Sequence, residues 1–443
     1  MTACDEPVPA TAASRPAPTA AEKTVRRDLS LYNNGLAVGV LGGAVTSVAL
    51  PSLALFTLKA TPMEMSVLYA VQRFPPAVTA LFAGALVDRH RKLRLLRWGK
   101  VVGGLLLLVV PVTALTGSLS LVVLCVIGFA LAAVNDISST AGISYLPSLA
   151  RGKSLAAANS RMGALFSFTD AAGSYLASGL IAVLGTSRAI LADVASYFIS
   201  AVCMAKIRTP EPHPEARPAG STLLREIKEG LGYARRHPVI RPLVLSNTAL
   251  ALAMTAWDVL FLIYVVRQLH WSPVVLAVVM GCASVGGVAG ALAGRRLAEP
   301  QGTRWGVGPL MLCALALQPL VLAPVLLAGP GLLWQIVIGA CVTCRFAGAT
   351  AHGSNQRSVR QSACDPQYQG RQQSIGTWIT FGPRFLSALG AGALVGAIGL
   401  KPSMTIAAIA TASGFVVLLL SPVRRLRAMP TPAGARRAVI DST

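Results

Sequence analysis

The stretch Gly84-Ala85-Leu86-Val87-Asp88-Arg89-His90-Arg91-Lys92 concentrates charge between two long apolar runs, residues 65–87 and 98–115. Two membrane-spanning helices need their connection in water or among lipid headgroups, and Lys and Arg hold such a connection on the cytoplasmic side. The stretch therefore predicts a helical hairpin in a membrane, with its loop in the cytoplasm.

The composition of the whole chain also indicates a membrane protein. Of its 443 residues, 54% are hydrophobic and 13% are charged, and the mean hydropathy is +0.62. A soluble protein carries about 25% charged residues. Each bilayer crossing takes about 20 apolar residues, so the apolar runs supply about a dozen crossings.

The predicted fold class is an all-α membrane protein with twelve transmembrane helices in two six-helix halves and both termini in the cytoplasm. The second span contains the tandem prolines Pro75-Pro76, which free backbone carbonyl groups that neighbouring helices or water must satisfy. We expect the helices at residues 31–58, 65–87, 98–115, 119–142, 160–184, 189–206, 240–267, 273–295, 305–328, 331–356, 373–398 and 402–421.

A break in the hydrophobic pattern divides the chain. Residues 207–238 carry several prolines and many charges, and their apolar residues from Leu223 to Leu231 share one helical face. We therefore expect an amphipathic helix on the inner membrane surface. The predicted division is a disordered cytoplasmic tail (1–28), an N-terminal half (29–206), a linker with this helix (207–238), a C-terminal half (239–421) and a basic cytoplasmic tail (422–443).

The net charge of +22 comes mainly from Lys and Arg residues in the loops and tails. Most of the 39 Lys and Arg residues fall in the tails and in the even-numbered connections. The exceptions are Lys59, Arg188, Arg267 and Lys401 near the opposite side, and Arg73, Arg345 and Arg384 inside helices. Such asymmetry places both termini in the cytoplasm, and it accounts for the basic balance without a nucleic-acid partner.

The sequence does not favour metal, cofactor or enzyme chemistry. The eight cysteines lie mostly inside apolar runs, and Cys341 and Cys344 are expected to be packing residues. The five histidines are scattered, and the sequence has no nucleotide-binding loop. We therefore expect no catalytic residues, no metal and no cofactor, and a membrane-embedded enzyme is the less favoured interpretation.

Glycines predict close helix packing in the second half. Gly286, Gly290 and Gly294 are spaced by four, which lets the backbone of a neighbouring helix approach. We expect similar packing in the span 373–398 from Gly390, Gly392, Gly396 and Gly399.

The charged stretch resembles the loop between helices 2 and 3 of major facilitator superfamily transporters. In that family the glycine lets helices pack closely, while the aspartate and the bases bridge neighbouring helix ends in one gating state. Gly84, Asp88, Arg89 and Lys92 match this pattern, whereas Arg91 stands where the family usually has glycine. The resemblance therefore implies a gating loop at these residues.

Further stretches resemble the macrolide-efflux and enterobactin-exporter type of drug and siderophore exporters within that superfamily. Among them are Tyr145-Leu146-Pro147-Ser148-Leu149, Leu191-Ala192-Asp193-Val194-Ala195-Ser196-Tyr197-Phe198, Glu226-Ile227-Lys228-Glu229-Gly230-Leu231 and Gly382-Pro383. The resemblance covers most of residues 30–425 and implies secondary active transport by alternating access.

The chain also departs from this type of exporter. Such exporters often carry an Asp near the middle of helix 1, where Leu41-Gly42-Gly43 stands here. The Gly-Pro signature of antiporters in helix 5 is replaced by Gly173-Ser174, and the span 119–142 lacks the Arg that many proton antiporters have. Proton coupling by the usual residues is therefore not expected.

Charged side chains inside the predicted spans are the candidate substrate and proton sites, because each costs about 2.5–3.5 kcal/mol to insert. Asp170 is the preferred proton site, since it lies near mid-membrane and burial makes a carboxylate easier to protonate. For Asp136, a structural contact with the charged stretch and a role in a cavity both stay open. Asp193 is expected to be structural, at the start of its helix, where a carboxylate suits the helix dipole. The candidates are Arg73, Asp136, Asp170, Asp258, Arg345 and Arg384.

The predicted function is export of a small amphipathic molecule, as in drug efflux and antibiotic resistance, with protons as the coupling ion. We expect a monomeric multi-pass protein in a bacterial plasma membrane. An importer or facilitator of a small solute on the same fold is the alternative. Intramembrane Asp and Arg give no strong charge preference, so a cation, a zwitterion or a neutral molecule are all open as substrates.

Overall fold

The computed structural model describes residues 20–79, 86–87, 90–149, 173, 176–177, 179–209, 211, 223–298, 306–365, 375–376, 378–428 and 430. Within these residues the secondary structure is helical, without strands. The helices are α1 (Ala20–Ser52), α2 (Pro62–Arg73), α4 (Lys92–Leu115), α5 (Leu121–Leu149), α7 (Thr186–Ala205), α8 (Leu223–Arg236), α9 (Ile240–Arg267), α10 (Pro273–Ala298), α11 (Val307–Leu326), α12 (Leu332–Ala363), α14 (Arg384–Ile398), α15 (Leu400–Ala410) and α16 (Ala412–Leu419).

Ten helices in the described part of the chain are long and apolar enough to cross a membrane. They occupy ten of the twelve predicted spans. The predicted span 65–87 is represented by α2 and by a second helical stretch at 75–79, separated by a bend at Phe74 next to the two prolines. The predicted span 160–184 is described only near its end, where residues 179–184 are helical.

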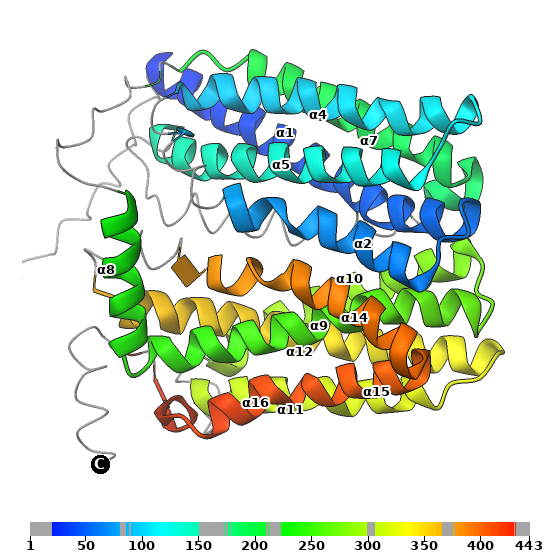
Figure 1. Ribbon diagram of the computed structural model, residues 1–443. Helices are drawn as coiled ribbons and strands as arrows, with labels where there is room; N and C mark the ends of the chain where they lie inside the picture. The colour runs from blue at the N-terminus through cyan, green and yellow to red at the C-terminus, as the bar shows by residue number, and fades with distance from the viewer. Residues whose placement is uncertain are drawn as a thin grey trace, which may run out of the picture.

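The helices form two bundles (Figure 1). One bundle contains α1, α4, α5 and α7, which pack on one another, and the other contains α9, α10, α11, α12, α15 and α16. Helices α2 and α14 pack directly against each other along the boundary between the bundles. This arrangement confirms the predicted fold of two helical halves.

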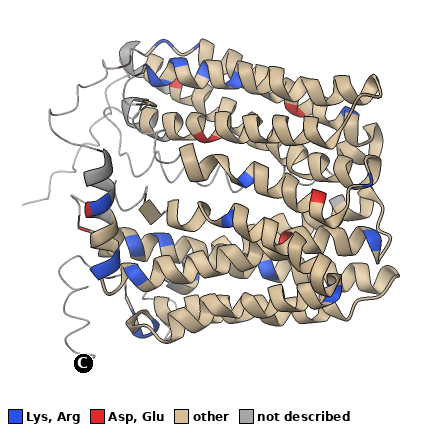
Figure 2. Ribbon diagram, viewed as in Figure 1, with Lys and Arg blue, Asp and Glu red and all other residues tan. Residues whose placement is uncertain are grey.

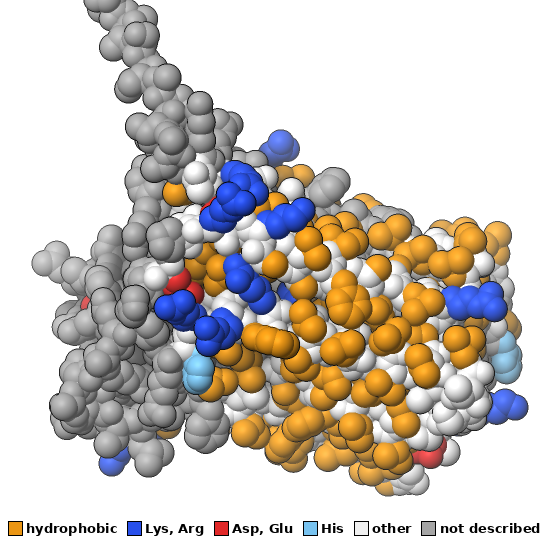
Figure 3. Space-filling view, turned by 90° about the horizontal axis from the view of Figure 1, so that it is seen from above, with side chains coloured by type: hydrophobic (Ala, Val, Ile, Leu, Met, Phe, Trp, Pro, Cys, Tyr) orange, Lys and Arg blue, Asp and Glu red, His pale blue; other side chains and the backbone are white. Residues whose placement is uncertain are grey.

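The surface of the bundles is suited to a bilayer. A broad apolar zone separates the Lys and Arg residues at the two ends of the molecule (Figure 3). Large apolar side chains are exposed there; examples are Leu105, Val122, Ile199, Leu320 and Ile336. Lys and Arg are more frequent at the end where α8 lies (Figure 2). By the positive-inside rule this end is cytoplasmic, and the opposite end is the outer one.

Helix α1 begins at Ala20, whereas the sequence predicted disorder up to residue 28. The Pro-rich part of the tail ends at Pro18, and the following residues are good helix formers. Asp28 is fully buried, and its Oδ2 accepts hydrogen bonds from the N–H groups of Arg208 and Thr209 at 2.9 and 2.7 Å. These contacts hold the start of α1 against the end of the N-terminal half, so the predicted disorder of residues 20–28 is wrong.

The glycines of α10 permit close packing against α12, as predicted. A Cβ atom on Gly286 would lie 2.0 Å from the carbonyl oxygen of Thr343, and one on Gly290 would lie 2.1 Å from that of Ala347. Since these are backbone atoms, neither helix could move aside without loss of packing. In α14 the prediction holds for Gly392 but not for Gly390 or Gly396, whose Cβ positions meet no described atom within 4 Å.

Helix α8 crosses the cytoplasmic end of the C-terminal bundle (Figure 1). The Tyr233 hydroxyl accepts a hydrogen bond of 3.0 Å from the N–H of Asp365, just after α12. Burial of this hydroxyl raises the pKa of Tyr233 to about 12. This contact ties α8 to the second half of the molecule.

Candidate functional site

A central cavity lies between the two halves. Its volume is about 300 Å³, and its polar lining includes Arg73 of α2, Asp193 of α7 and Arg384 of α14. Leu50, Pro76, Leu131 and Phe381 supply much of its apolar lining. Because the lining comes from both halves, a bound molecule would touch the two parts that alternating access requires to move.

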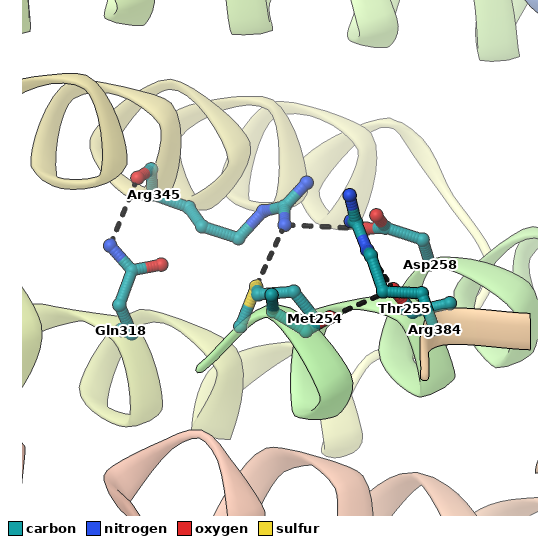
Figure 4. Close-up of polar contacts among 7 residues, drawn as sticks. Met254, Thr255, Asp258, Gln318, Arg345 and Arg384 are labelled. Atoms are coloured by element: carbon teal, nitrogen blue, oxygen red, sulfur yellow. Dashed lines mark hydrogen bonds and ion pairs between the residues drawn. The ribbon is translucent and has the colours of Figure 1, made fainter. Parts of the chain in front are cut away.

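Arg384 is held in place by the C-terminal half. Its Nε donates a hydrogen bond of 2.7 Å to Thr255 Oγ1 of α9, and its guanidinium lies 5.2 Å from the centre of the Phe381 ring. Figure 4 shows the side chain reaching from α14 towards α9. The sequence prediction that Arg384 belongs to a substrate site is consistent with this position, since the residue lines the central cavity.

Asp193 is not at the start of its helix. It lies about two turns inside α7, and it is 1% exposed. Its carboxylate accepts hydrogen bonds from the hydroxyl groups of Thr46 and Ser196, the latter at 2.8 Å. The expectation of a helix-dipole contact is therefore wrong: α7 begins earlier than the apolar pattern suggested, and the carboxylate faces the central cavity.

Gly42 of α1 makes room for this carboxylate. A Cβ atom at Gly42 would lie 2.3 Å from Asp193 Oδ1 and 2.0 Å from Ser196 Oγ. Any larger residue at this position would collide with both side chains. The carboxylate of α7 thus occupies the space beside the middle of α1, where the resembling exporters often carry an Asp.

A second cavity of about 400 Å³ lies within the N-terminal half, towards the cytoplasmic end. It shares Gly43, Asn135 and Tyr197 with the central cavity. Asn135 and Tyr197 bond each other, with an amide-to-hydroxyl distance of 2.9 Å, and so lie between the two spaces. Lys100 lines the second cavity, and its Nζ is 5.2 Å from the centre of the Tyr197 ring.

Sequence reasoning missed this polar cluster of Thr46, Lys100, Asn135, Asp193 and Tyr197. Lys100 lies inside the predicted span 98–115 and inside α4, but it is missing from the candidate charges within helices. A usable signal was present in α7, where Asp193, Ser196, Tyr197 and Ser200 recur at helical spacing. Such spacing predicts one polar face on an otherwise apolar helix.

Arg345 and Asp258 form an ion pair in the C-terminal half. Arg345 Nη1 is 3.3 Å from Asp258 Oδ1, and it also lies 3.1 Å from the sulfur of Met254 (Figure 4). The backbone carbonyl of Arg345 accepts a hydrogen bond from Gln318 at 3.2 Å. The structure therefore brings together two of the predicted site residues that the sequence could not pair.

Asp136 contacts the stretch after the tandem prolines. It accepts a hydrogen bond from the hydroxyl of Thr79, which also bonds the carbonyl of Pro75 at 2.8 Å. This contact joins α5 to the helical stretch 75–79. Asp136 itself is absent from the described linings of both cavities, whereas its neighbour Asn135 lines each of them.

Several predicted residues lie outside the described part of the chain: Gly84, Asp88, Arg89 and Asp170. Lys92 is described as the first residue of α4. The backbone N–H groups of Lys92 and Leu93 donate to the carboxylate of Glu211 at 2.6 and 3.2 Å. A carboxylate at a helix N-terminus satisfies otherwise unpaired donors, so Glu211 holds the start of α4.

The outer ends of the two halves are in contact. Arg267 of α9 donates to the carbonyl groups of Lys59 and Ala60, at 3.4 and 2.5 Å, in the connection before α2. Gly392 of α14 packs so closely on α2 that a Cβ there would lie 2.6 Å from Ser66 Oγ. These contacts join the two halves on the outer side of the central cavity.

Within the described residues, no group of three or more His, Cys, Asp or Glu is arranged to hold a metal ion. The polar groups of the described residues discussed above are distributed over two cavities and an ion pair inside the helical bundles.

Comparisons with solved structures agree with this architecture. A mutant of the nucleoside transporter NupG is 12% identical, with a TM-score of 0.71 over 89% of this chain and 99% of that one. A bacterial homologue of the iron transporter ferroportin, in an inward-facing state, is 16% identical, with a TM-score of 0.67 over 89% and 98%. A variant of the E. coli fucose:proton symporter FucP is 17% identical, with a TM-score of 0.55 over 88% and 97%.

At these identities the likeness shows the fold alone. No curated protein matches the sequence of the chain. A sequence model of one protein family does match it, over residues 35–388, which is most of the chain and includes helices of both halves. The chain therefore belongs to the Major Facilitator Superfamily.

Proposed function

We propose that the protein is a secondary active transporter that exports a small amphipathic molecule by alternating access. The observation that carries this proposal is the central cavity, which is lined by both halves and combines charged and apolar side chains. A cavity of about 300 Å³ is within the range that binds small organic molecules. The resemblance to drug and siderophore exporters supports export, and a bacterial plasma membrane is the proposed location.

The contacts at the outer side favour one side of the membrane as the side from which the substrate enters the central cavity. The bonds of Arg267 to Lys59 and Ala60, and the packing of α14 on α2, hold the two halves together at their outer ends, which supports loading from the other side. A molecule would therefore enter the cavity from the cytoplasmic side in this state. Release outside would require these outer contacts to part.

The alternative is import or facilitated movement of a small solute on the same fold. The structural relatives include proteins named as a nucleoside transporter and as a fucose:proton symporter, so the fold itself does not favour one direction. An exporter lowers the accumulation of its substrate in expressing cells, and an importer raises it.

We further propose protons as the coupling ion, with Asp193 as the carboxylate that exchanges them. Asp193 lines the central cavity and is held by hydroxyl groups of Thr46 and Ser196, which can bond either form of the carboxyl group. It also fills the space beside Gly42, where related exporters often carry an Asp. Asp170, the carboxyl group predicted from sequence, remains the second candidate.

The gating role predicted for Gly84, Asp88, Arg89 and Lys92 also remains a proposal. Of these residues Lys92 is described, and Glu211, which bonds the first N–H groups of α4, would hold Lys92 in place. Asp88→Asn should reduce transport strongly at near-normal membrane abundance if the loop is a state-dependent latch.

The test of function uses cells with and without the protein, challenged with a panel of amphipathic cations, anions and neutral compounds. Export predicts higher tolerance and lower accumulation of at least one compound in expressing cells. Higher accumulation would support the importer instead, and identical behaviour across the panel would contradict transport of amphipathic molecules.

Coupling is tested with purified protein in proteoliposomes, using a compound from that panel and an imposed pH gradient. Asp193→Asn should abolish concentrative transport and retain exchange of labelled for unlabelled compound. Asp136→Asn is the matched control and should keep concentrative transport, because Asp136 bonds Thr79 away from the described cavity linings. Concentrative transport by Asp193→Asn would exclude Asp193 as the coupling residue.

A further inference from the structure

We propose that the substrate carries an anionic group, such as a carboxylate, which binds between Arg73 and Arg384 in the central cavity. The inference rests on the proposed function, because it takes this cavity to be the substrate site. It narrows the substrate class to amphipathic organic anions, a class that the sequence alone did not favour.

The two arginines come from opposite halves. Arg73 is the last residue of α2, Arg384 is the first residue of α14, and both line the same cavity. They are also close enough to interact electrostatically. Two like charges in a membrane cavity repel each other, and an anion between them removes this repulsion.

The guanidinium of Arg384 is held in an orientation that suits binding of an anionic group. Thr255 fixes its Nε and the ring of Phe381 lies over its guanidinium, so the terminal nitrogens keep one orientation. Within the described residues, Arg73 makes no hydrogen bond or ion pair. Guanidinium groups bind carboxylates through paired, charge-assisted hydrogen bonds, which suits both side chains to the same ligand.

The acidic groups near the cavity already have partners. Asp193 is held by Thr46 and Ser196 and interacts with Lys100 on its other side. Asp258 is paired with Arg345 at 3.3 Å, and it is also close enough to Arg384 to interact with it electrostatically. One carboxylate is thus shared between Arg345 and Arg384, and Arg73 adds a further positive charge, so an anionic substrate would supply the missing negative charge.

The rest of the cavity suits an apolar body. Leu50, Pro76 and Leu131 line it, and Phe381 adds an aromatic ring. An amphipathic anion would place its charge between the arginines and its apolar part against these side chains.

Binding to both arginines would also link the substrate to the conformational change. An anion that bonds Arg73 and Arg384 together favours the states in which the halves are close at this level. A ligand shifts an equilibrium only through its different affinity for the two states. A neutral analogue lacks this difference, so it should bind weakly and should not promote closure.

The experiment measures binding of three matched compounds to purified full-length protein by calorimetry: 1-naphthoate, its neutral methyl ester and the cation 1-naphthylmethylamine. We expect naphthoate to bind at least about tenfold more tightly than either analogue, because it alone gains charge-assisted hydrogen bonds. Tighter binding of the amine would overturn the anion proposal while leaving transport of an amphipathic molecule intact.

Substitutions of the two arginines test which side chains bind the anionic group of naphthoate. Arg73→Gln and Arg384→Gln should each weaken naphthoate binding at least about tenfold and leave binding of the ester unchanged, which also shows that the variants are folded. Lys401→Gln is the control for a general effect of positive charge, because Lys401 is exposed and is absent from the linings of both cavities. Equal loss in Lys401→Gln, or no loss in the two arginine variants, would contradict the proposed site.

Discussion

Two of the acidic residues inside this membrane protein, Asp193 and Asp258, are held by specific partners. Arg345 has Asp258 at 3.3 Å, with side-chain exposures of 11% and 36%, while Asp193 has two hydroxyl donors. Removing one member of a pair leaves a charge without compensation in a medium of low dielectric constant. Stability should therefore depend more on the pairing of these charges than on their presence.

The Arg345–Asp258 pair gives a prediction at this scale. Asp258→Asn should destabilise the protein by about 1–3 kcal/mol, below the range for fully buried pairs because Asp258 is partly exposed. The double variant Asp258→Asn with Arg345→Gln should recover much of this loss, since neither charge remains. Thermal unfolding in detergent measures both effects. Additive losses in the double variant would show that the two side chains do not stabilise each other.

At the scale of helices, close approach depends on glycine where two backbones meet. Helices α10 and α12 pack against each other through Gly286, Gly290 and Gly294. Lipid chains are as apolar as most side chains, so association of helices within the bilayer depends on van der Waals packing of this kind. A single added methyl group at the contact should therefore separate the pair.

Gly290→Ala tests this packing against a control in the same helix. Its new Cβ would lie 2.1 Å from the carbonyl oxygen of Ala347, whereas a Cβ at Gly287 would lie 3.6 Å from Thr350 Oγ1. Overpacking costs about 1–3 kcal/mol, so Gly290→Ala should lower the unfolding temperature. Gly287→Ala should leave it unchanged or raise it slightly, because alanine is the better helix former. Equal effects of the two substitutions would contradict the close approach.

At the scale of the whole molecule, the two halves meet at α2 and α14 and at the outer contact of Arg267. These contacts hold the two halves together on the outer side. Transport by alternating access requires two arrangements of similar free energy. A change that blocks the outer contact should therefore favour the outward-open arrangement without unfolding either half.

Gly392→Leu is expected to have this effect. A Cβ at Gly392 would lie 2.6 Å from Ser66 Oγ across the boundary, while one at Gly390 meets no described atom within 4 Å. Overpacking of about 1–3 kcal/mol should raise the outward-open population about tenfold. The readout is labelling of Ser47→Cys, in the central cavity, by an impermeant maleimide applied to cells that express a cysteine-free background. Gly390→Leu should not change the labelling rate; faster labelling in both variants would point to a general loosening.

The fold and the glycine packing of α10 could be predicted from sequence because they depend on local properties of the chain. The length of an apolar run, the bases at its ends and a repeat of glycines are all readable from residues near one another. The proposed boundary between the halves at residues 207–238 rests on a local pattern of the same kind. Sequence also identified Arg73, Asp258, Arg345 and Arg384 as intramembrane charges, since each interrupts an apolar run.

Tertiary structure decided which of these charges meet. Asp258 and Arg345 lie on α9 and α12, and Arg73 and Arg384 lie on α2 and α14, so their contacts depend on how helices distant in sequence cross. The same crossing placed Asp193 in the cavity beside Gly42; the polar spacing in α7 predicts a polar face, but it does not show which helix or cavity that face meets. Apolar length is a property of one segment, whereas a binding site requires the register and rotation of several helices at once.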